Sequence, residues 1–184
     1  MLLLLSGCGS RPELPARSAA VPVGADLSGR WELQGLNEET NSRLVEPDQG
    51  IYVPPAGSIR RDQMPERSAR TKRSKGPLVH LFIENGRALK ISQTAHGIFV
   101  SFDRSVVEEY TFGENRVVSL GPIEAQRVSG WDGLRYIVET MDDRGTVLTE
   151  TWSLKDAGSE LVREIKILDG EKELYSSRQV FDRT

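Results

Sequence analysis

The chain has 184 residues, 38% of them hydrophobic, with a formal net charge of −3 and one cysteine. This mildly acidic balance argues against a general nucleic-acid-binding protein, which would carry a basic surface. A single cysteine excludes an internal disulfide and a cysteine-rich metal site. No stretch approaches the roughly 20 apolar residues of a transmembrane helix. The length predicts a single domain once the N-terminal segments are set aside.

The N-terminus has a short leucine run that ends in the sequence Leu-Ser-Gly-Cys at residues 5–8. This stretch resembles the signal of bacterial lipoproteins, although the apolar run is shorter than the usual ~7–15 residues and no basic residue precedes it. The resemblance implies that residues 1–8 form a signal with a lipidated Cys8, which anchors the chain in a bacterial cell envelope membrane. By the sorting rule of the lipoproteins that this stretch resembles, Gly9 after the cysteine implies the outer membrane, facing the periplasm. The alternative is an apolar N-terminus with an unmodified cysteine.

Two segments have the composition of linkers. Residues 9–25 are rich in Pro, Ala, Ser and Gly, which predicts a flexible tether before one domain at 26–184. Residues 37–77 have few apolar residues and no sustained period, which predicts a disordered insertion. Its part at 59–75 holds seven Lys or Arg against two acidic residues, a net charge of about +5. This basic insertion either binds an anionic membrane or partner, or is a solvated loop.

From Leu78 onward, short β-branched and aromatic runs alternate with turn sequences. Asn-Gly or Asp-Gly pairs at 85–86, 132–133 and 169–170 favour tight hairpins, because these residues tolerate positive φ. The close spacing leaves no room for crossover helices, so the sheet must be antiparallel. With one strand near Trp31, we predict an all-β meander of about 9–10 strands that closes into a barrel, and a sandwich is the alternative.

The register of the late strands predicts which side chains share the inner face. The loop before Leu161 places Trp152 opposite Arg163. It also places Glu150 opposite Ile165. This face is strongly apolar apart from its two charged residues, so it is the face that we expect to be buried.

A tight turn at 169–170 extends this register to the last strand. It would place Ser176 opposite Arg163 and Arg178 opposite Leu161. The predicted inner face then carries Leu148, Glu150, Trp152, Leu154, Leu161, Arg163, Ile165, Ile167, Leu174, Arg178 and Val180.

The preceding hairpin admits loops of different length. A two- or four-residue loop would bury Arg135 and Glu139. A three-residue loop at 143–145 instead places Tyr136 opposite Trp152. Burying tyrosine costs less than burying charged residues, so we predict the three-residue loop, with its glycine in the left-handed conformation.

These registers gather five candidate ligand-binding residues on the inner face: Tyr136, Glu150, Trp152, Arg163 and Arg178. In one interpretation they form a structural network in which Arg163 pairs with Glu150 and stacks on Trp152. In the other, two arginines against one glutamate leave one guanidinium free to bind an anion. An apolar cavity with an inward arginine suits a fatty acid or a similar amphipathic carboxylate.

The first predicted strand, in the sequence DLSGRWEL at residues 26–33, contains Gly29 and Trp31. This Gly-x-Trp pattern resembles the opening strand of lipocalins. The resemblance implies a barrel that binds a small ligand and a late arginine that packs over the tryptophan, for which Arg183 is the candidate. The inward arginines of the last strands are also similar to those of fatty-acid-binding proteins.

Residues suited to catalysis are few. His80 falls in a predicted strand and His96 in a turn, and there is no nucleophile elbow, zinc-protease motif or phosphate loop. We therefore expect no enzyme activity, catalytic residue, metal site or cofactor. The classes left open are a ligand-binding barrel, an envelope adaptor that acts through contacts with another envelope protein, and an enzyme whose polar groups form no known motif.

Overall fold

The computed structural model describes residues 13–35 and 78–184. Cys8 and the basic insertion lie outside the described residues. The strands are β1 (Gly29–Leu33), β2 (Ala88–Gln93), β3 (Gly97–Phe102), β4 (Val106–Thr111), β5 (Glu114–Leu120), β6 (Ile123–Asp132), β7 (Arg135–Met141), β8 (Thr146–Lys155), β9 (Glu160–Asp169) and β10 (Lys172–Arg183). Two 3-10 turns, η3 (Val79–Phe82) and η4 (Asp156–Gly158), complete the described elements.

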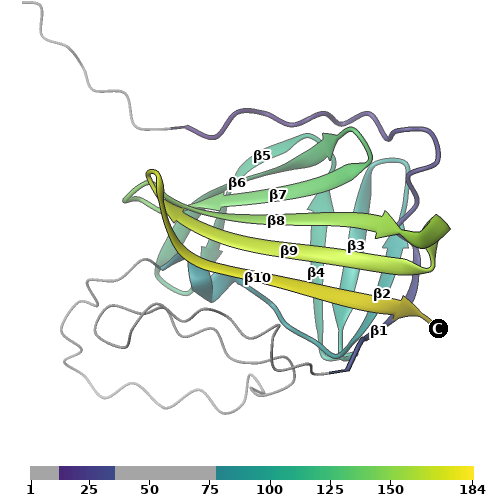
Figure 1. The fold of residues 1–184 in the computed structure, drawn as a ribbon. Coiled ribbons are helices and arrows are strands. Elements are labelled where there is room, and N and C mark those ends of the chain that lie inside the picture. Colours follow the sequence, from purple (N-terminus) through teal and green to yellow (C-terminus); the bar gives the residue numbers. More distant parts are fainter. Residues whose placement is uncertain (1–12, 36–77) are drawn as a thin grey trace, which may run out of the picture.

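All ten strands belong to one antiparallel sheet that curls into a barrel (Figure 1). The order is β4-β3-β2-β1-β10-β9-β8-β7-β6-β5, and β1 pairs with both β2 and β10. The predicted antiparallel meander that closes into a barrel is therefore confirmed, and the sandwich is not formed. β4 and β5 follow one another in the chain but stand at opposite ends of the strand order. We call the line between them the β4–β5 seam.

The turn between β7 and β8 fixes the register of the inner wall. The amide of Gly145 donates to the carbonyl oxygen of Asp142 at 3.1 Å, and Gly145 has a φ of 85°, which glycine adopts without steric cost. Tyr136 lies opposite Trp152, and Val138 lies opposite Glu150. The predicted three-residue loop is confirmed. The predicted pairing of β8 with β9, with Trp152 opposite Arg163, is confirmed as well.

The register of β10 differs from the prediction. Two changes shift the pairing by three residues, so that Gln179, not Ser176, lies opposite Arg163. Asp169 pairs with Lys172, which places the turn at Gly170-Glu171 and not at the predicted 169–170, and a β-bulge lies between Glu173 and Tyr175. Because an extra residue exchanges the two faces of a strand, the predicted inward position of Arg178 is wrong. Arg178 is exposed and lies opposite Glu164.

The same shift changes the apolar positions at the end of β10. Phe181, not Arg178, lies opposite Leu161, and both apolar side chains are fully buried. Val180 pairs with Val162 and is only half-buried, so its predicted inward position is wrong too.

Two apolar clusters occupy the barrel. The larger cluster includes Trp31, Tyr136, Trp152 and Phe181. The full membership of the smaller cluster is Val79, Phe82, Val118, Ala125, Leu148, Ile165, Ile167 and Tyr175. Val79 and Phe82 belong to η3, so this short turn packs onto the smaller cluster and covers it.

Residues 13–25, which we call the N-terminal strap, run along the outside of the barrel (Figure 1). Leu14 is buried with Val128 and Met141. Arg17 forms an ion pair with Glu139 at 2.7 Å. Composition predicts a flexible tether over residues 9–25. In the structure, the burial of Leu14 and the Arg17–Glu139 ion pair hold residues 13–25 against the sheet.

The strap is also attached to the C-terminal end of β6, beyond the last residue of β6 that pairs with β5. The amide of Trp131 donates to the carbonyl oxygen of Ser18 at 2.9 Å, and these residues form an isolated antiparallel bridge. The chain passes so close to β6 that a Cβ atom at Gly130 would lie 2.4 Å from the Ser18 oxygen. Glycine at this position is therefore a requirement of the contact.

None of the described helical turns has the length and apolar character needed to cross a bilayer. Within residues 13–35 and 78–184, His, Cys, Asp and Glu side chains nowhere form a group of three that could hold a metal ion.

Candidate ligand-binding interior

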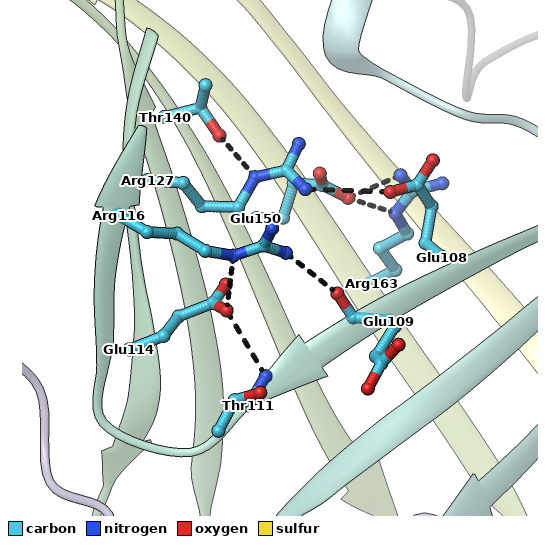
Figure 2. Close-up of polar contacts among 9 residues, drawn as sticks. All are labelled: Glu108, Glu109, Thr111, Glu114, Arg116, Arg127, Thr140, Glu150 and Arg163. Carbon is cyan, nitrogen blue, oxygen red and sulfur yellow. Dashed lines mark hydrogen bonds and ion pairs between the residues drawn. The ribbon is translucent and has the colours of Figure 1, made fainter. Parts of the chain in front are cut away.

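Three arginines and three glutamates of the described chain lie along the inner wall and at the seam, in a band that we call the polar belt (Figure 2). Its members are Glu108, Glu114, Arg116, Arg127, Glu150 and Arg163. The alternation of strand side chains places the belt between the two apolar clusters. On β8, Glu150 lies between Trp152 of the larger cluster and Leu148 of the smaller.

Arg163 is the most tightly held cation of the belt. It is 1% exposed; its Nε donates to Glu150 Oε2 at 2.8 Å, and its Nη2 contacts the same oxygen. Its Nη1 donates to the carbonyl oxygen of Glu84 at 2.8 Å and to Gln179 Oε1 at 3.2 Å. The guanidinium carbon lies 4.8 Å from the centre of the Trp152 ring. This is the structural network that the first interpretation predicts.

Arg127 on β6 is a second buried arginine, which the sequence analysis missed. It is 5% exposed, and its Nε donates to Thr140 Oγ1 at 3.3 Å. Its Nη1 lies 3.5 Å from Glu108 Oε2, across the seam on β4 (Figure 2). The guanidinium also lies over the rings of Phe82 and Tyr110, at 5.8 Å and 5.5 Å. Residues 127, 129 and 131 lie on one face of β6, and this alternation could have indicated that Arg127 points inward. No pairing register was predicted for β6, so the signal was not used.

The third pair of the belt helps to close the β4–β5 seam. Arg116 Nε donates to Glu114 Oε2 at 2.9 Å, and its Nη2 reaches the carbonyl oxygen of Glu109 at 3.4 Å (Figure 2). The amide of Thr111 donates to Glu114 Oε2 at 3.3 Å. Side chains therefore join β4 to β5 where the sheet has no backbone ladder.

The polar belt contains equal numbers of positive and negative side chains, and each arginine lies beside a glutamate. The prediction of an unpaired guanidinium rested on Arg163 and Arg178 sharing Glu150, but Arg178 points away from the interior and Arg163 is paired. The other two cations, Arg116 and Arg127, each lie beside a glutamate. An anion is therefore not required to neutralise the interior.

Two buried hydrogen-bond donors, Trp131 Nε1 and Trp152 Nε1, lack an acceptor among the described residues, and Tyr136 Oη between them has only a weak side-chain contact with Ser129. They belong to the adjacent strands β6, β7 and β8, whose register aligns Trp131 with Tyr136 and Tyr136 with Trp152. Trp131 and Tyr136 are also in ring contact, with centroids 5.3 Å apart. The donors therefore form a row across the inner face of three strands.

The two interior tyrosines are held in their neutral forms. Burial raises the pKa of Tyr110 well above its ordinary value, and the negative charge of Glu150 adds to this effect. Burial also raises the pKa of Tyr136, and the nearby Ser129 side chain offsets only part of the increase. Each hydroxyl therefore keeps its proton at neutral pH and can act as a donor.

The arginine and tryptophan of the lipocalin-like pattern meet at one end of the barrel. The guanidinium carbon of Arg183 lies 4.3 Å from the centre of the buried Trp31 ring, and its Nη1 donates to the carbonyl oxygen of Ser28 at 3.0 Å. Gly29 has a φ of 154°, and a Cβ there would lie 3.0 Å from Arg183 Nη1. The packing that the resemblance implies is present, and it closes this end.

A cover segment, residues 78–86, lies over the smaller cluster. Asp142 Oδ2 accepts the amide of Leu78 at 3.2 Å, and the carbonyl oxygen of Glu84 accepts from Arg163. His80 lies within this segment, in η3 rather than in a strand, and His96 is exposed in the turn between β2 and β3. Neither histidine belongs to the polar belt.

Comparison with known proteins gives a fold but no family. No family model matches the chain, and no curated protein matches its sequence. A luciferase domain from the dinoflagellate Lingulodinium polyedrum is similar in structure, with a TM-score of 0.51 and 15% identity over 96% of this chain and 47% of that chain.

Two further solved structures match at lower scores. Apo lipid binding protein 8 from Caenorhabditis elegans has a TM-score of 0.48 and 12% identity, over 90% of this chain and 100% of its own. The fatty acid transporter REP1-NXSQ has a TM-score of 0.46 and 14% identity, over 87% and 97%. At these identities a likeness describes the fold alone, so what the comparisons establish is that this chain shares the β-barrel fold of the luciferase domain.

Proposed function

We propose that this protein binds a small amphipathic molecule, such as a fatty acid, inside its barrel, without catalysing a reaction. We further propose that acylation of Cys8 holds it at the periplasmic face of a bacterial outer membrane. The observation that carries the binding proposal is the row of buried donors on Trp131, Tyr136 and Trp152.

A buried donor without an acceptor destabilises a fold by about 1–3 kcal/mol. The two tryptophan donors therefore destabilise a barrel that only has to fold, and the weakly held Tyr136 hydroxyl adds to this. A ligand whose polar group accepts hydrogen bonds would offset this cost. The aromatic side chains around the donors, including Phe112 and Tyr110, would pack against its apolar part.

The support for the envelope location comes from the sequence alone. The Leu-Ser-Gly-Cys stretch at 5–8 resembles a lipoprotein signal. An acylated protein at a membrane surface is well placed to exchange amphipathic molecules with that membrane. The location and the ligand class are therefore consistent with each other.

A second candidate function, an envelope adaptor, is favoured by one surface feature. Phe99 on β3 and Val107 on β4 are 38% and 62% exposed, and Val117 on β5, across the seam from β4, is 63% exposed. Exposed apolar side chains on adjoining strands are a common feature of protein-binding surfaces. The partner would be another protein of the envelope.

The binding proposal is tested by the fluorescence of the interior tryptophans, together with native mass spectrometry of the protein purified from its own membrane. We expect a retained small molecule, and a change in tryptophan emission when the stripped protein is titrated with a fatty acid. If no molecule is retained and neither fatty acids nor fatty alcohols change the emission, the binding proposal fails and the adaptor function is preferred.

A further inference from the structure

We infer that Arg127 is the residue that binds the acidic group of an amphipathic carboxylate, by exchanging its contact with Glu108 for the ligand. The inference rests on the proposed function, because the ligand must enter the barrel. It adds the chemical class of the polar group and the residue that recognises it.

The two buried arginines, Arg127 and Arg163, differ in how many of their N–H donors form hydrogen bonds. A guanidinium has five N–H donors. Arg163 makes hydrogen bonds from all three of its nitrogens. Arg127, although it is 5% exposed, makes one hydrogen bond within the described chain, the 3.3 Å bond to Thr140. A buried cation with spare donors is a site for an anion, and Arg127 is the arginine of the belt that has this property.

The present partner of Arg127 is replaceable. Charge-assisted hydrogen bonds are commonly about 2.7–2.9 Å long, and the 3.5 Å separation between Arg127 Nη1 and Glu108 Oε2 is well beyond that length. The Glu108 side chain is 24% exposed, whereas that of Glu150 is 3% exposed. Glu108 can therefore turn into solvent when a competing carboxylate arrives, and Glu150 cannot.

The surroundings of Arg127 orient it for a flat, two-oxygen ligand. The rings of Phe82 and Tyr110 lie beside the guanidinium, and Thr140 holds its Nε. Aromatic contacts leave the in-plane N–H groups available, and these match the two oxygens of a carboxylate. The ligand's negative charge would replace that of Glu108, so the interior would remain balanced.

The position of Arg127 also suits entry and exit. It contacts Glu108 across the β4–β5 seam, where no backbone ladder joins the strands and the side-chain contacts of Glu114 and Arg116 would have to break for them to separate. It also contacts Phe82 of the cover segment. A carboxylate bound to Arg127 would therefore lie at the junction of the seam and the cover segment.

The test uses the full-length protein and two probes of equal chain length, laurate and dodecanol, titrated by tryptophan fluorescence and by calorimetry. We expect the wild type to bind laurate more tightly than dodecanol. Arg127→Met should weaken laurate binding by about tenfold or more, as expected for loss of a charge-assisted contact, and should leave dodecanol binding unchanged. Arg178→Met, which removes an arginine from the outer surface, is the matched control and should change neither affinity.

Glu108→Gln gives the converse test and avoids removing a buried side chain. Because it removes the carboxylate that competes for Arg127, laurate binding should become several-fold tighter while dodecanol binding stays the same. A purely structural role for Arg127 predicts no such gain.

The outcomes separate the two proposals. If the wild type binds both probes and neither Arg127→Met nor Glu108→Gln alters the preference for laurate, the inference is overturned while the proposed function stands. If the wild type binds neither probe and retains no small molecule from its membrane, the proposed function fails and the inference falls with it. If it retains a molecule but binds neither probe, the inference is overturned while the proposed function stands. If Arg127→Met does not fold, the Glu108→Gln result decides: tighter laurate binding supports the inference, and an unchanged affinity overturns it.

Discussion

Glu150 and Arg163 form an ion pair between adjacent strands β8 and β9 in which the glutamate is 2% exposed and the arginine 1%. Removing one partner of such a pair leaves the other buried and uncompensated, which costs about 3–5 kcal/mol. The same guanidinium holds the carbonyl of Glu84 in the cover segment. The pair therefore joins the inner wall to the cover.

We predict that Arg163→Met lowers the free energy of unfolding by about 3–5 kcal/mol, because Glu150 loses its buried partner. Combining it with Glu150→Leu should restore much of the loss, since two apolar residues need no partner. The restoration should be incomplete, because the contacts to Glu84 and Gln179 stay broken. A double-mutant cycle read by denaturant unfolding measures this. Additive single losses would show that the two residues are not energetically coupled.

We predict that stability falls as the pH rises above about 10, the ordinary pKa of tyrosine, because the pKa values of Tyr110 and Tyr136 are raised in the fold. Above that pH the unfolded chain releases these protons while the folded chain retains them. Each retained proton then costs up to ~1.4 kcal/mol per pH unit. Denaturant unfolding at pH 9 and pH 11 should show the loss, and the Tyr110→Phe, Tyr136→Phe double variant should show a smaller one. Equal slopes for the two proteins would contradict the prediction.

We predict that Gly130→Ala detaches the N-terminal strap, because the new Cβ would lie 2.4 Å from the carbonyl oxygen of Ser18 and 2.7 Å from Arg17 Cβ. Limited proteolysis should then cleave within the strap much faster than in the wild type, while the barrel remains folded by circular dichroism. Gly35→Ala is the matched control, since a Cβ there has no neighbour within 4 Å. Unchanged protection of the strap in Gly130→Ala would rule out this account of its attachment.

We predict that Cys8→Ser, expressed in the protein's own host, moves the protein from the membrane fraction to the soluble fraction. The physical reason is that the acyl chains, each methylene contributing roughly 0.8 kcal/mol on burial, would be lost. Cell fractionation with immunoblotting measures the distribution, and Ser6→Ala, two residues earlier, provides the comparison. A distribution that is the same for wild type and Cys8→Ser would show that Cys8 is not the anchor.

The hairpins of the barrel could be predicted because turn chemistry and burial both constrain register. Asp142 to Gly145 could be assigned a loop length, since every alternative buried Arg135 and Glu139. The β10 bulge could not be predicted, because a bulge at residues 173–175 leaves no compositional mark and depends on how the strand fits the curvature of the sheet. Without the bulge, the predicted register assigned Arg178 to the inner face, and the apparent excess of interior cations followed from that assignment.

The candidate site was predicted only where neighbouring strands fix it. Glu150, Trp152 and Arg163 are cross-strand neighbours, so the local register was enough. Arg127 meets Glu108 across the β4–β5 seam, and a contact between unpaired strands cannot be found by register. Predicting the Arg127–Glu108 contact would require knowing how the whole barrel closes. The sequence indicates that closure only through the lipocalin-like pattern of Trp31 and Arg183.

The pairing of β1 with β10 also has a consequence for how the chain reaches its native state. Trp31 lies opposite Arg183, so the second strand partner of β1 is the very end of the described chain. A growing polypeptide can form the hairpins within β2–β4 and then within β5–β9, but it cannot join them through β1 until the last strand has been synthesised. Contacts between distant parts of a sequence slow folding, and an open sheet exposes its apolar face until it closes. The barrel of this chain can therefore close only after the whole of β10 has been synthesised.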